Sequence, residues 1–214
     1  MANLVKYYTR GRHPKGFWGK RVLKEMNSER HSQLPEWTFD KFHIGDKFHI
    51  LDIGCGGGAN IRRMLALNET STATGLDISQ IAIEKTIDEN YPAYVDKRCV
   101  VMGGNVMQMP FAKEVFDLVT AYETIYYWMS LDSAIIEAMR VLKPGGTLVI
   151  ANELDGLSQE DDLLAKAVGG MRIYTPDEIK QSMAEAGLID VQAWHDETSH
   201  HVCVTGKKDQ APQH

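Results

Sequence analysis

Strand-like and helix-like segments alternate along this chain up to residue 150, and that alternation constrains its fold more than any other feature. Five short apolar runs are typical of buried strands. They lie at 48–53, 72–78, 98–102, 116–122 and 148–151. Helical periodicity separates several of them, at 59–67, 80–90 and 131–142. Alternation of this kind favours parallel strands joined by right-handed helical crossovers, so we expect an α/β protein with a mostly parallel sheet.

Two further strand signals close the chain, at about 188–195 and 201–206. They follow a helix that starts at Thr175-Pro176, with proline at the first helical position, and ends at Gly187. Only about five residues separate the two strands, which is too short for a helical crossover. We therefore expect them to form an antiparallel hairpin at the edge of the sheet.

The composition argues against several classes of protein. The 214 residues include 23 basic and 29 acidic ones, a net charge of −6, which disfavours a dedicated nucleic-acid binder. No apolar run approaches the ~18 residues that span a bilayer, and the N-terminus lacks the apolar stretch of a signal peptide. Three cysteines fit a reducing compartment. We expect a cytoplasmic protein without a membrane partner, either a monomer or a homodimer.

The charge is unevenly distributed, which suggests a boundary. Residues 1–30 hold eight basic residues and two acidic ones, whereas the rest of the chain is acidic. The spacing of Trp18, Val22 and Met26 predicts one helix, and Pro35 opens a second. The basic segment is consistent with steering of an anionic substrate, or with a solvated helix face that docks on the acidic body. We expect a helical lid over 1–45, a main domain over 46–208 and a polar tail over 209–214.

A glycine-rich turn follows the first strand of the main domain, in the sequence LDIGCGGGAN. Glycines at positions 54, 56 and 58 let a ligand lie against the backbone because no Cβ intervenes. In an open parallel sheet this turn lies at the carboxyl ends of the strands, where ligands bind. Asp77 ends the next strand, 19 residues beyond Gly58, where a carboxylate can accept both hydroxyls of a ribose. The sequence therefore predicts a nucleoside site.

These features also fit a dinucleotide-binding oxidoreductase, because residues 54–59 match the pattern G-x-G-x-x-A. Asp52, however, lies two residues before the first glycine. An acid in that place would repel a pyrophosphate and suit a cationic ligand. The second half of the chain has no further glycine fingerprint and ends in the expected hairpin. A nicotinamide-dependent oxidoreductase stays open as an alternative.

Five motifs occur in order: LDIGCGGG, GLDIS, GNVMQMPF, FDLVTAYETIYYW and LKPGG. Together, over about 46–206, they resemble class I S-adenosylmethionine-dependent methyltransferases. The chain is most similar to the small-molecule branch, which includes the ubiquinone/menaquinone-biosynthesis type. The resemblance implies a Rossmann-like three-layer sandwich around a seven-stranded sheet. It also implies methyl transfer from S-adenosyl-L-methionine to a small-molecule acceptor by in-line displacement, with S-adenosyl-L-homocysteine as product. A non-catalytic S-adenosylmethionine-binding module is the second alternative.

The resemblance assigns roles around the methionine part of the cofactor. Gly54, Gly56 and Gly58 would form the cradle beneath it, and the backbone of Cys55 would line the same turn. Asp52 would lie near the ammonium group or hold the loop.

The resemblance also assigns roles around the nucleoside. Asp77 would accept the ribose hydroxyls and Ile78 would pack on one adenine face. Asn105 stands where the family usually has an acid, and its amide oxygen can still accept from the adenine amino group. The backbone N–H of Val106 would donate to an adenine ring nitrogen. Tyr122 would border the sulfonium.

Substrate contacts are expected from the loops after the fourth and fifth strands. The acid and aromatic side chains concerned are Glu123, Tyr126, Tyr127, Trp128 and Tyr174. Such a group can enclose an apolar or cationic acceptor, although two of the aromatics also fit the core beneath a lid. Candidates for a general base are His31, Glu123 and Tyr127. The methyl is already activated, so we expect no catalytic triad.

No metal site and no nucleic-acid partner are expected. His195, His200, His201 and Cys203 match no usual zinc spacing, and the adjacent histidines 200 and 201 would face opposite sides of a strand. No Asn-Pro-Pro-Tyr-like motif follows the fourth strand, where the sequence reads AYET.

Overall fold

The computed structural model describes residues 1–210 apart from residues 13, 15, 17–18, 20 and 24–32. One seven-stranded sheet runs in the order β3-β2-β1-β4-β5-β7-β6. The strands are β1 (His49–Ile53), β2 (Thr72–Asp77), β3 (Cys99–Gly103), β4 (Phe116–Tyr122), β5 (Leu142–Asn152), β6 (Ile189–Asp196) and β7 (His201–Lys207). β1 to β5 pair in parallel, and β7 pairs antiparallel with both β5 and β6. The expected parallel sheet with a C-terminal hairpin is confirmed.

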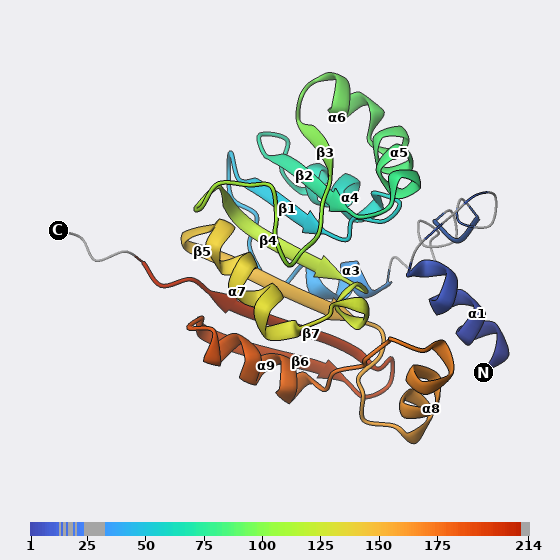
Figure 1. Ribbon diagram of the computed structural model, residues 1–214. Helices are drawn as coiled ribbons and strands as arrows, with labels where there is room; N and C mark the ends of the chain where they lie inside the picture. Colours follow the sequence, from blue (N-terminus) through green and yellow to red (C-terminus); the bar gives the residue numbers. More distant parts are fainter. Residues whose placement is uncertain (13, 15, 17–18, 20, 24–32, 211–214) are drawn as a thin grey trace.

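Helices cover both faces of the sheet (Figure 1). They are α1 (Ala2–Gly11), α3 (Gln33–Thr38), α4 (Ala59–Leu67), α5 (Gln80–Glu89), α6 (Tyr91–Val95), α7 (Leu131–Val141), α8 (Gln159–Val168) and α9 (Pro176–Glu185), with a 3-10 turn, η2 (Ile125–Tyr127). Side chains of α7 and α9 form one core with Leu51 and Ile150. Those of α4 form a second core with Ile50 and Val149. Because neighbouring strand residues point to opposite helix layers, the fold is a three-layer sandwich.

Two helix starts follow the signals in the sequence. The Ser79 hydroxyl caps α5 by accepting from the backbone N–H of Ala82. At α9, Thr175 and Glu178 form a reciprocal capping box, and Pro176 stands in the first turn. The expected starts of these two helices are therefore confirmed.

The segment Lys143-Pro144-Gly145-Gly146 differs from expectation. The predicted helix ends at 142 and the predicted strand begins at 148, which leaves this segment between two elements, but β5 already begins at Leu142. The pairing with β4 jumps from Leu142 to Thr147, so the segment bulges within the strand. Its backbone keeps strand partners because Gly145 N–H donates to Lys208 and Lys208 N–H donates to Gly146.

The N-terminal region is described in part. The predicted short helix around Pro35 is confirmed as α3, with Leu34 and Pro35 buried. The helix expected around Trp18 and Met26 falls largely outside the described residues. The sequence reading missed α1, α6 and α8, although α8 has a clear signal: Ser158 caps it by accepting from the N–H of Asp161. Among the described residues, no helix has both the length and the apolar character that a bilayer crossing requires.

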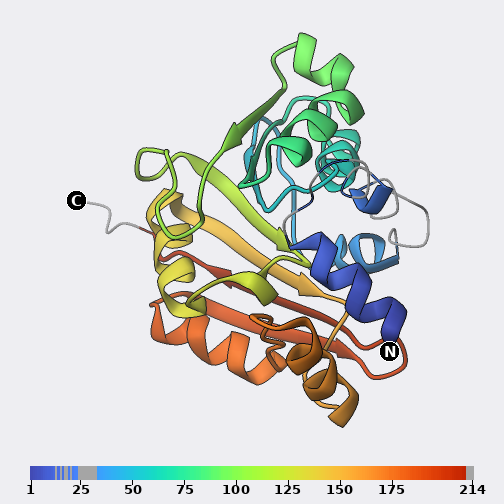
Figure 2. The ribbon, with the colours of Figure 1, turned by 45° about the vertical axis from the view of Figure 1, so that its right-hand side comes forward.

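The sheet order places a ligand site beside β1 and β4. The chain leaves β1 toward β2 on one side, and β4 lies on the other, so crossovers run in opposite directions from this point. Ligands in open α/β sheets bind at such a switch point, at the carboxyl ends of the strands. Figures 1 and 2 show α1 beside α8 near this end of the sheet, and the Arg12 guanidinium donates to the carbonyl of Gly169.

Candidate functional site

The turn after β1 is built from three glycines that have different structural roles. A Cβ on Gly54 would lie 2.2 Å from the Thr124 hydroxyl oxygen, and one on Gly58 would lie 2.7 Å from the Asn90 amide nitrogen. These two glycines therefore permit close packing. Gly56 differs, because a Cβ there would meet nothing closer than 3.8 Å. Its φ of +54° favours glycine, and its open side faces a cavity.

That cavity has a volume of about 290 Å³, near the lower end of the range for small-molecule sites. It lies at the carboxyl ends of β1, β2 and β4 beneath α1. Its lining includes the sequence-predicted residues Gly54, Gly56, Asp77, Ile78, Asn105, Val106, Tyr122, Glu123, Tyr127 and Trp128. Cys55 lines a smaller cavity of about 70 Å³ that shares Gly54, Gly56, Tyr122 and Glu123 with the first. The fold thus gathers most of the predicted site residues.

Asp77 lines the larger cavity, and two backbone N–H groups hold its carboxylate in place. One carboxylate oxygen accepts from the backbone N–H of Gly56 at 3.0 Å, and the other accepts from that of Ser79 at 2.8 Å. A carboxylate oxygen can accept more than one hydrogen bond, so a carboxyl group held in this way suits a ligand hydroxyl. Ile78 beside it is 62% exposed, although it is a large apolar side chain. This is the surface that a flat apolar ligand group would cover.

Asn105 and Val106 form the far wall. The Asn105 side-chain oxygen accepts from the backbone N–H of Met107 at 2.9 Å, so it stabilises a turn. The same oxygen keeps a second acceptor position.

Glu123 is an acid of the site whose pKa departs strongly from its ordinary value. It follows β4 directly, with a φ of +56°. Its carboxyl accepts from the hydroxyls of Tyr126 at 2.7 Å and Tyr8 at 3.4 Å, and from the backbone N–H of Glu153. Burial and the nearby Glu153 carboxylate raise the pKa of Glu123 to about 8. The side chain borders both cavities.

Several expected site residues lie elsewhere. Tyr126 is buried beneath Glu123, and Tyr174 is buried under the Arg172 guanidinium, so neither lines the two cavities. Gly58 packs against α5. Asp52 is buried beneath the turn and accepts from the Thr120 hydroxyl at 2.8 Å, and burial raises its pKa to about 7. His31 lies outside the described residues.

The sequence reading missed the contributions of α1 and of the loop after β5. Tyr7, Tyr8 and Arg12 line the larger cavity, while Tyr7 and Glu153 line the smaller one. The Tyr127 hydroxyl donates to the carbonyl of Tyr8, which joins α1 to η2. The adjacent tyrosines 7 and 8 in the basic segment, residues 1–30, were the feature of the sequence that could have indicated this contribution.

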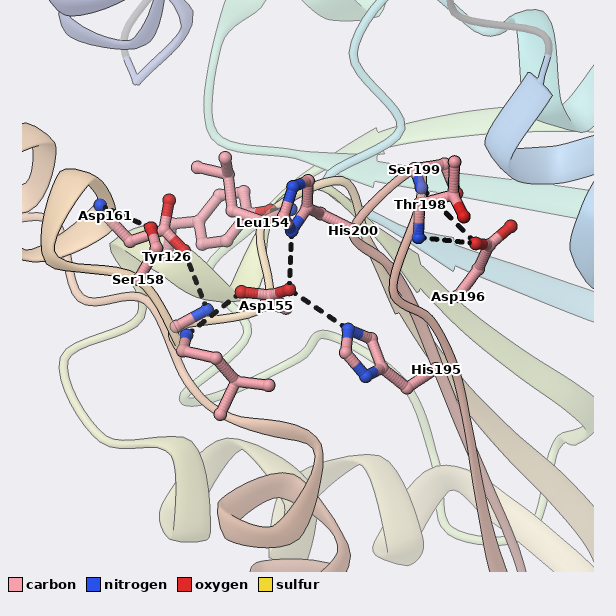
Figure 3. A network of polar contacts seen from close by, with 12 residues as sticks. Tyr126, Leu154, Asp155, Ser158, Asp161, His195, Asp196, Thr198, Ser199 and His200 are labelled. Carbon is pink, nitrogen blue, oxygen red and sulfur yellow. Dashed lines mark hydrogen bonds and ion pairs between the residues drawn. The ribbon is translucent and has the colours of Figure 1, made fainter.

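The loop after β5 is anchored by a network away from the cavity (Figure 3). The buried Asp155 carboxylate contacts His195 at 3.0 Å and His200 at 2.8 Å, and it accepts from the N–H of Leu157. His201, the first residue of β7, contacts the Trp37 ring, whereas His200 lies in the turn before the strand. No cluster of potential metal ligands occurs in the part of the chain that the structure describes.

Residues 51–150 match the family described as a methyltransferase domain. A 27-O-demethylrifamycin SV methyltransferase from Amycolatopsis mediterranei is 33% identical over 150 residues, which is 67% of this chain and 54% of that protein. An erythromycin 3''-O-methyltransferase from Saccharopolyspora erythraea is 30% identical over 196 residues, which is 83% of this chain and 61% of that protein. The chain thus spans little more than half the length of these two relatives.

A solved structure shares the fold. It is geranyl diphosphate C-methyltransferase from Streptomyces coelicolor A3(2), in complex with Mg²⁺, geranyl diphosphate and S-adenosyl-L-homocysteine. The TM-score is 0.75 at 15% identity, covering 91% of this chain and 85% of that one. The sequence match and the shared fold agree with the geometry of the glycine turn and Asp77. This chain therefore carries a methyltransferase domain of the class I S-adenosylmethionine-dependent family.

Proposed function

We propose that the protein transfers a methyl group from S-adenosylmethionine to a small-molecule acceptor whose reacting atom carries a proton. The observation that carries this proposal is one cavity in which the open glycine turn, the Asp77 carboxylate and the half-buried Glu123 carboxyl converge. The turn and Asp77 suit a nucleoside with an amino-acid tail, and Glu123 suits proton transfer.

The residues present fit this cofactor. Asp77 would accept the ribose hydroxyls and Ile78 would cover one adenine face, while Asn105 and the Val106 N–H would meet the adenine edge. Gly54, Gly56 and the Cys55 backbone would border the methionine part, with Asp52 holding the turn from below and Tyr122 near the sulfur. The acids that line the cavities, Asp77, Glu123 and Glu153, favour a positively charged ligand over a pyrophosphate.

When bound, the cofactor supplies a methyl group that its positive sulfur already activates. The chain then has to align the acceptor and exclude water, and alignment alone contributes up to about 7–11 kcal/mol in favourable cases. Residues 1–45 would act as the lid, since Tyr7 and Tyr8 of α1 line the larger cavity. The acceptor's proton would pass to the Glu123 carboxylate as the new bond to the methyl forms, with Tyr8 and Tyr126 holding that carboxylate in place.

The acceptor class follows from the rest of the lining. Tyr127, Trp128 and Met129 give one side of the cavity an apolar and aromatic wall. The two relatives named for rifamycin and erythromycin are methyltransferases of small molecules, and one is named as an O-methyltransferase. We infer an acceptor with an apolar body and a hydroxyl, phenol or amine as its nucleophile.

Cofactor binding tests the first part of this proposal. Calorimetric titration should give saturable binding of S-adenosylmethionine. Asp77→Asn should weaken the affinity about 10- to 100-fold, because hydrogen bonds to a charged acceptor contribute about 1.5–3 kcal/mol. Asp88→Asn, an exposed acid on α5, is the matched control and should bind normally. Equal affinities for wild type and Asp77→Asn would remove the ribose assignment.

Transfer tests the second part. Incubation with methyl-labelled cofactor and a metabolite extract should yield a labelled small molecule. Binding without any labelled product would instead indicate a non-catalytic binding module. We further infer a reducing, cytoplasmic environment, because the three cysteines are buried and unpaired. Sedimentation would distinguish the monomer from the homodimer.

A further inference from the structure

We propose that Glu123 gives up a proton when S-adenosylmethionine binds, so that the carboxylate that receives the acceptor's proton forms only in the loaded enzyme. This inference rests on the proposed function and adds an order of events to it. The proton leaves the Glu123 carboxyl for solvent as the cofactor enters. During transfer, the carboxylate then takes the proton that the acceptor loses.

The position of Glu123 is the first observation behind this inference. Its side chain borders both cavities. Its carboxyl also accepts hydrogen bonds from three other segments, namely α1, η2 and the loop after β5. Its backbone adopts a left-handed φ of +56°, which is costly for a residue with a Cβ. The backbone N–H still donates to the Ala151 carbonyl at 2.9 Å, so the sheet holds this conformation in place. Such strain is typical of functional positions.

Within the described part of the chain, the groups that donate hydrogen bonds to the Glu123 carboxyl include no cation. Tyr8 from α1, Tyr126 from η2 and the Glu153 backbone donate to its carboxyl, and none of these donors is charged. The charge of Glu153, after β5, opposes the ionisation of Glu123. Thus the described residues provide the geometry for a carboxylate without the positive charge that would balance it.

Other titratable groups also face the cavities. The Tyr127 hydroxyl, on η2, lies against α1, and Arg12 lines the cavity while its guanidinium donates to Gly169. Asp77 lies across the cavity on β2, and Asp52 lies beneath the turn after β1. Burial also raises the pKa of Asp52, to about 7, so Asp52 is the competing source of a proton.

The positive charge of the bound cofactor would balance the Glu123 carboxylate, which the described residues around it do not. With a pKa of about 8, the Glu123 carboxyl is mostly protonated at neutral pH before binding. A positive charge in the same cavity lowers a carboxyl pKa by about 1–3 units. We therefore expect binding at pH 7 to release a measurable fraction of one proton per cofactor. S-adenosylhomocysteine has a neutral sulfur, so its binding should release clearly less.

Calorimetry in buffers of different ionisation enthalpy, such as phosphate and Tris, measures this number directly. The difference in proton release between S-adenosylmethionine and S-adenosylhomocysteine should be largest near neutral pH. It should decline at acidic pH, where Glu123 stays protonated, and at alkaline pH, where it is already ionised. Equal release with the two ligands would overturn the inference.

Three variants identify the proton's source. Glu123→Gln should bind the cofactor and lose the difference between the two ligands, whereas Asp52→Asn should retain it. Glu153→Gln should reduce it, because removal of a like charge lets Glu123 ionise before binding. Glu160→Gln, an exposed acid on α8, should behave as wild type. Retention of the difference in Glu123→Gln, or its loss only in Asp52→Asn, would refute the assignment. Absence of binding by either ligand would instead refute the proposed function.

Discussion

At the scale of single residues, the turn after β1 separates a binding role from a packing role among chemically identical glycines. Gly56 has open space where a Cβ would stand, whereas Gly58 is pressed against Thr86 and Asn90 of the α5 region. Both have positive φ, so the cost of a left-handed alanine is common to the two positions. The difference between them comes from what surrounds each one.

The two alanine variants should therefore fail in different ways. Gly56→Ala should lose about 1–2 kcal/mol of folding free energy and most of its cofactor affinity, because the new methyl projects into the cavity. Gly58→Ala should lose more stability, about 2–5 kcal/mol, because backbone strain and a clash add. Urea melts and calorimetric titration measure the two effects. Identical behaviour of the variants would contradict the division of roles.

Sequence reasoning worked best for residues that act within one motif. Gly56, Asp77 and Ile78 lie on consecutive strand ends, and local spacing was enough to bring them to one cavity. Tyr126 and Tyr174, expected at the substrate opening, are buried and line neither cavity, because burial depends on helices far away in sequence. For the same reason Tyr8 was missed: it meets Glu123 across 115 positions of the chain.

At the scale of elements, the start of the loop between β5 and α8 is held by contacts to two different parts of the molecule. Glu153 and Leu154 donate through their N–H groups to Glu123 and to the Tyr126 hydroxyl. One residue further on, Asp155 contacts His195 and His200 of the β6–β7 hairpin (Figure 3). The hairpin that closes the sheet thus supports the loop that positions the site.

Removing the charge of this anchor should loosen the loop. Asp155→Asn should lower the free energy of unfolding by about 1–3 kcal/mol, because a buried acceptor of charge-assisted hydrogen bonds is lost. Asp190→Asn, which removes the partner of the exposed Lys207, should change it by less than about 0.5 kcal/mol. Thermal melts compare the two. Hydrogen exchange at Glu153 and Leu154 should also accelerate in Asp155→Asn, and unchanged protection there would contradict the link to the site.

Most elements could be predicted from the sequence, and the exceptions have physical reasons. The strands and the capped helices α5 and α9 follow local signals. The early start of β5 could not be predicted, because Lys143 to Gly146 reads as a turn until Lys208, far along the chain, supplies backbone partners. The helix α1 has no side-chain cap and is held by its tertiary contacts.

At the scale of the whole molecule, buried acids set how stability responds to pH. Burial raises the pKa of Asp52 to about 7 and that of Glu123 to about 8. In the unfolded chain both groups ionise at their ordinary values, so raising the pH favours unfolding until each folded-state pKa is passed. The contribution of these two acids to the free energy of unfolding is therefore fully present below about pH 4, and it declines as the pH rises to about 8.

The cofactor-free protein should accordingly be more stable at about pH 5.5 than at about pH 8, with all other titrations held in common. The double variant Asp52→Asn/Glu123→Gln should lose most of this slope, and denaturant melts at a series of pH values measure it. Asp155, whose pKa the Leu157 N–H and the neighbouring histidines lower against the effect of its burial, stays ionised in the folded and the unfolded chain over this pH range and does not contribute to the slope. An unaltered slope would show that the two acids are not neutral in the folded state.

The cysteines provide a further consequence of this burial. Burial raises the pKa of Cys99 to about 11 and that of Cys203 to about 12, and it raises that of Cys55 as well. Because the thiolate is the reactive form, alkylating reagents should modify these sulfurs only during transient openings of the structure. Cys55 belongs to the glycine turn itself. Its alkylation rate, followed by mass spectrometry, therefore measures how often the turn beside the ligand-binding cavity opens.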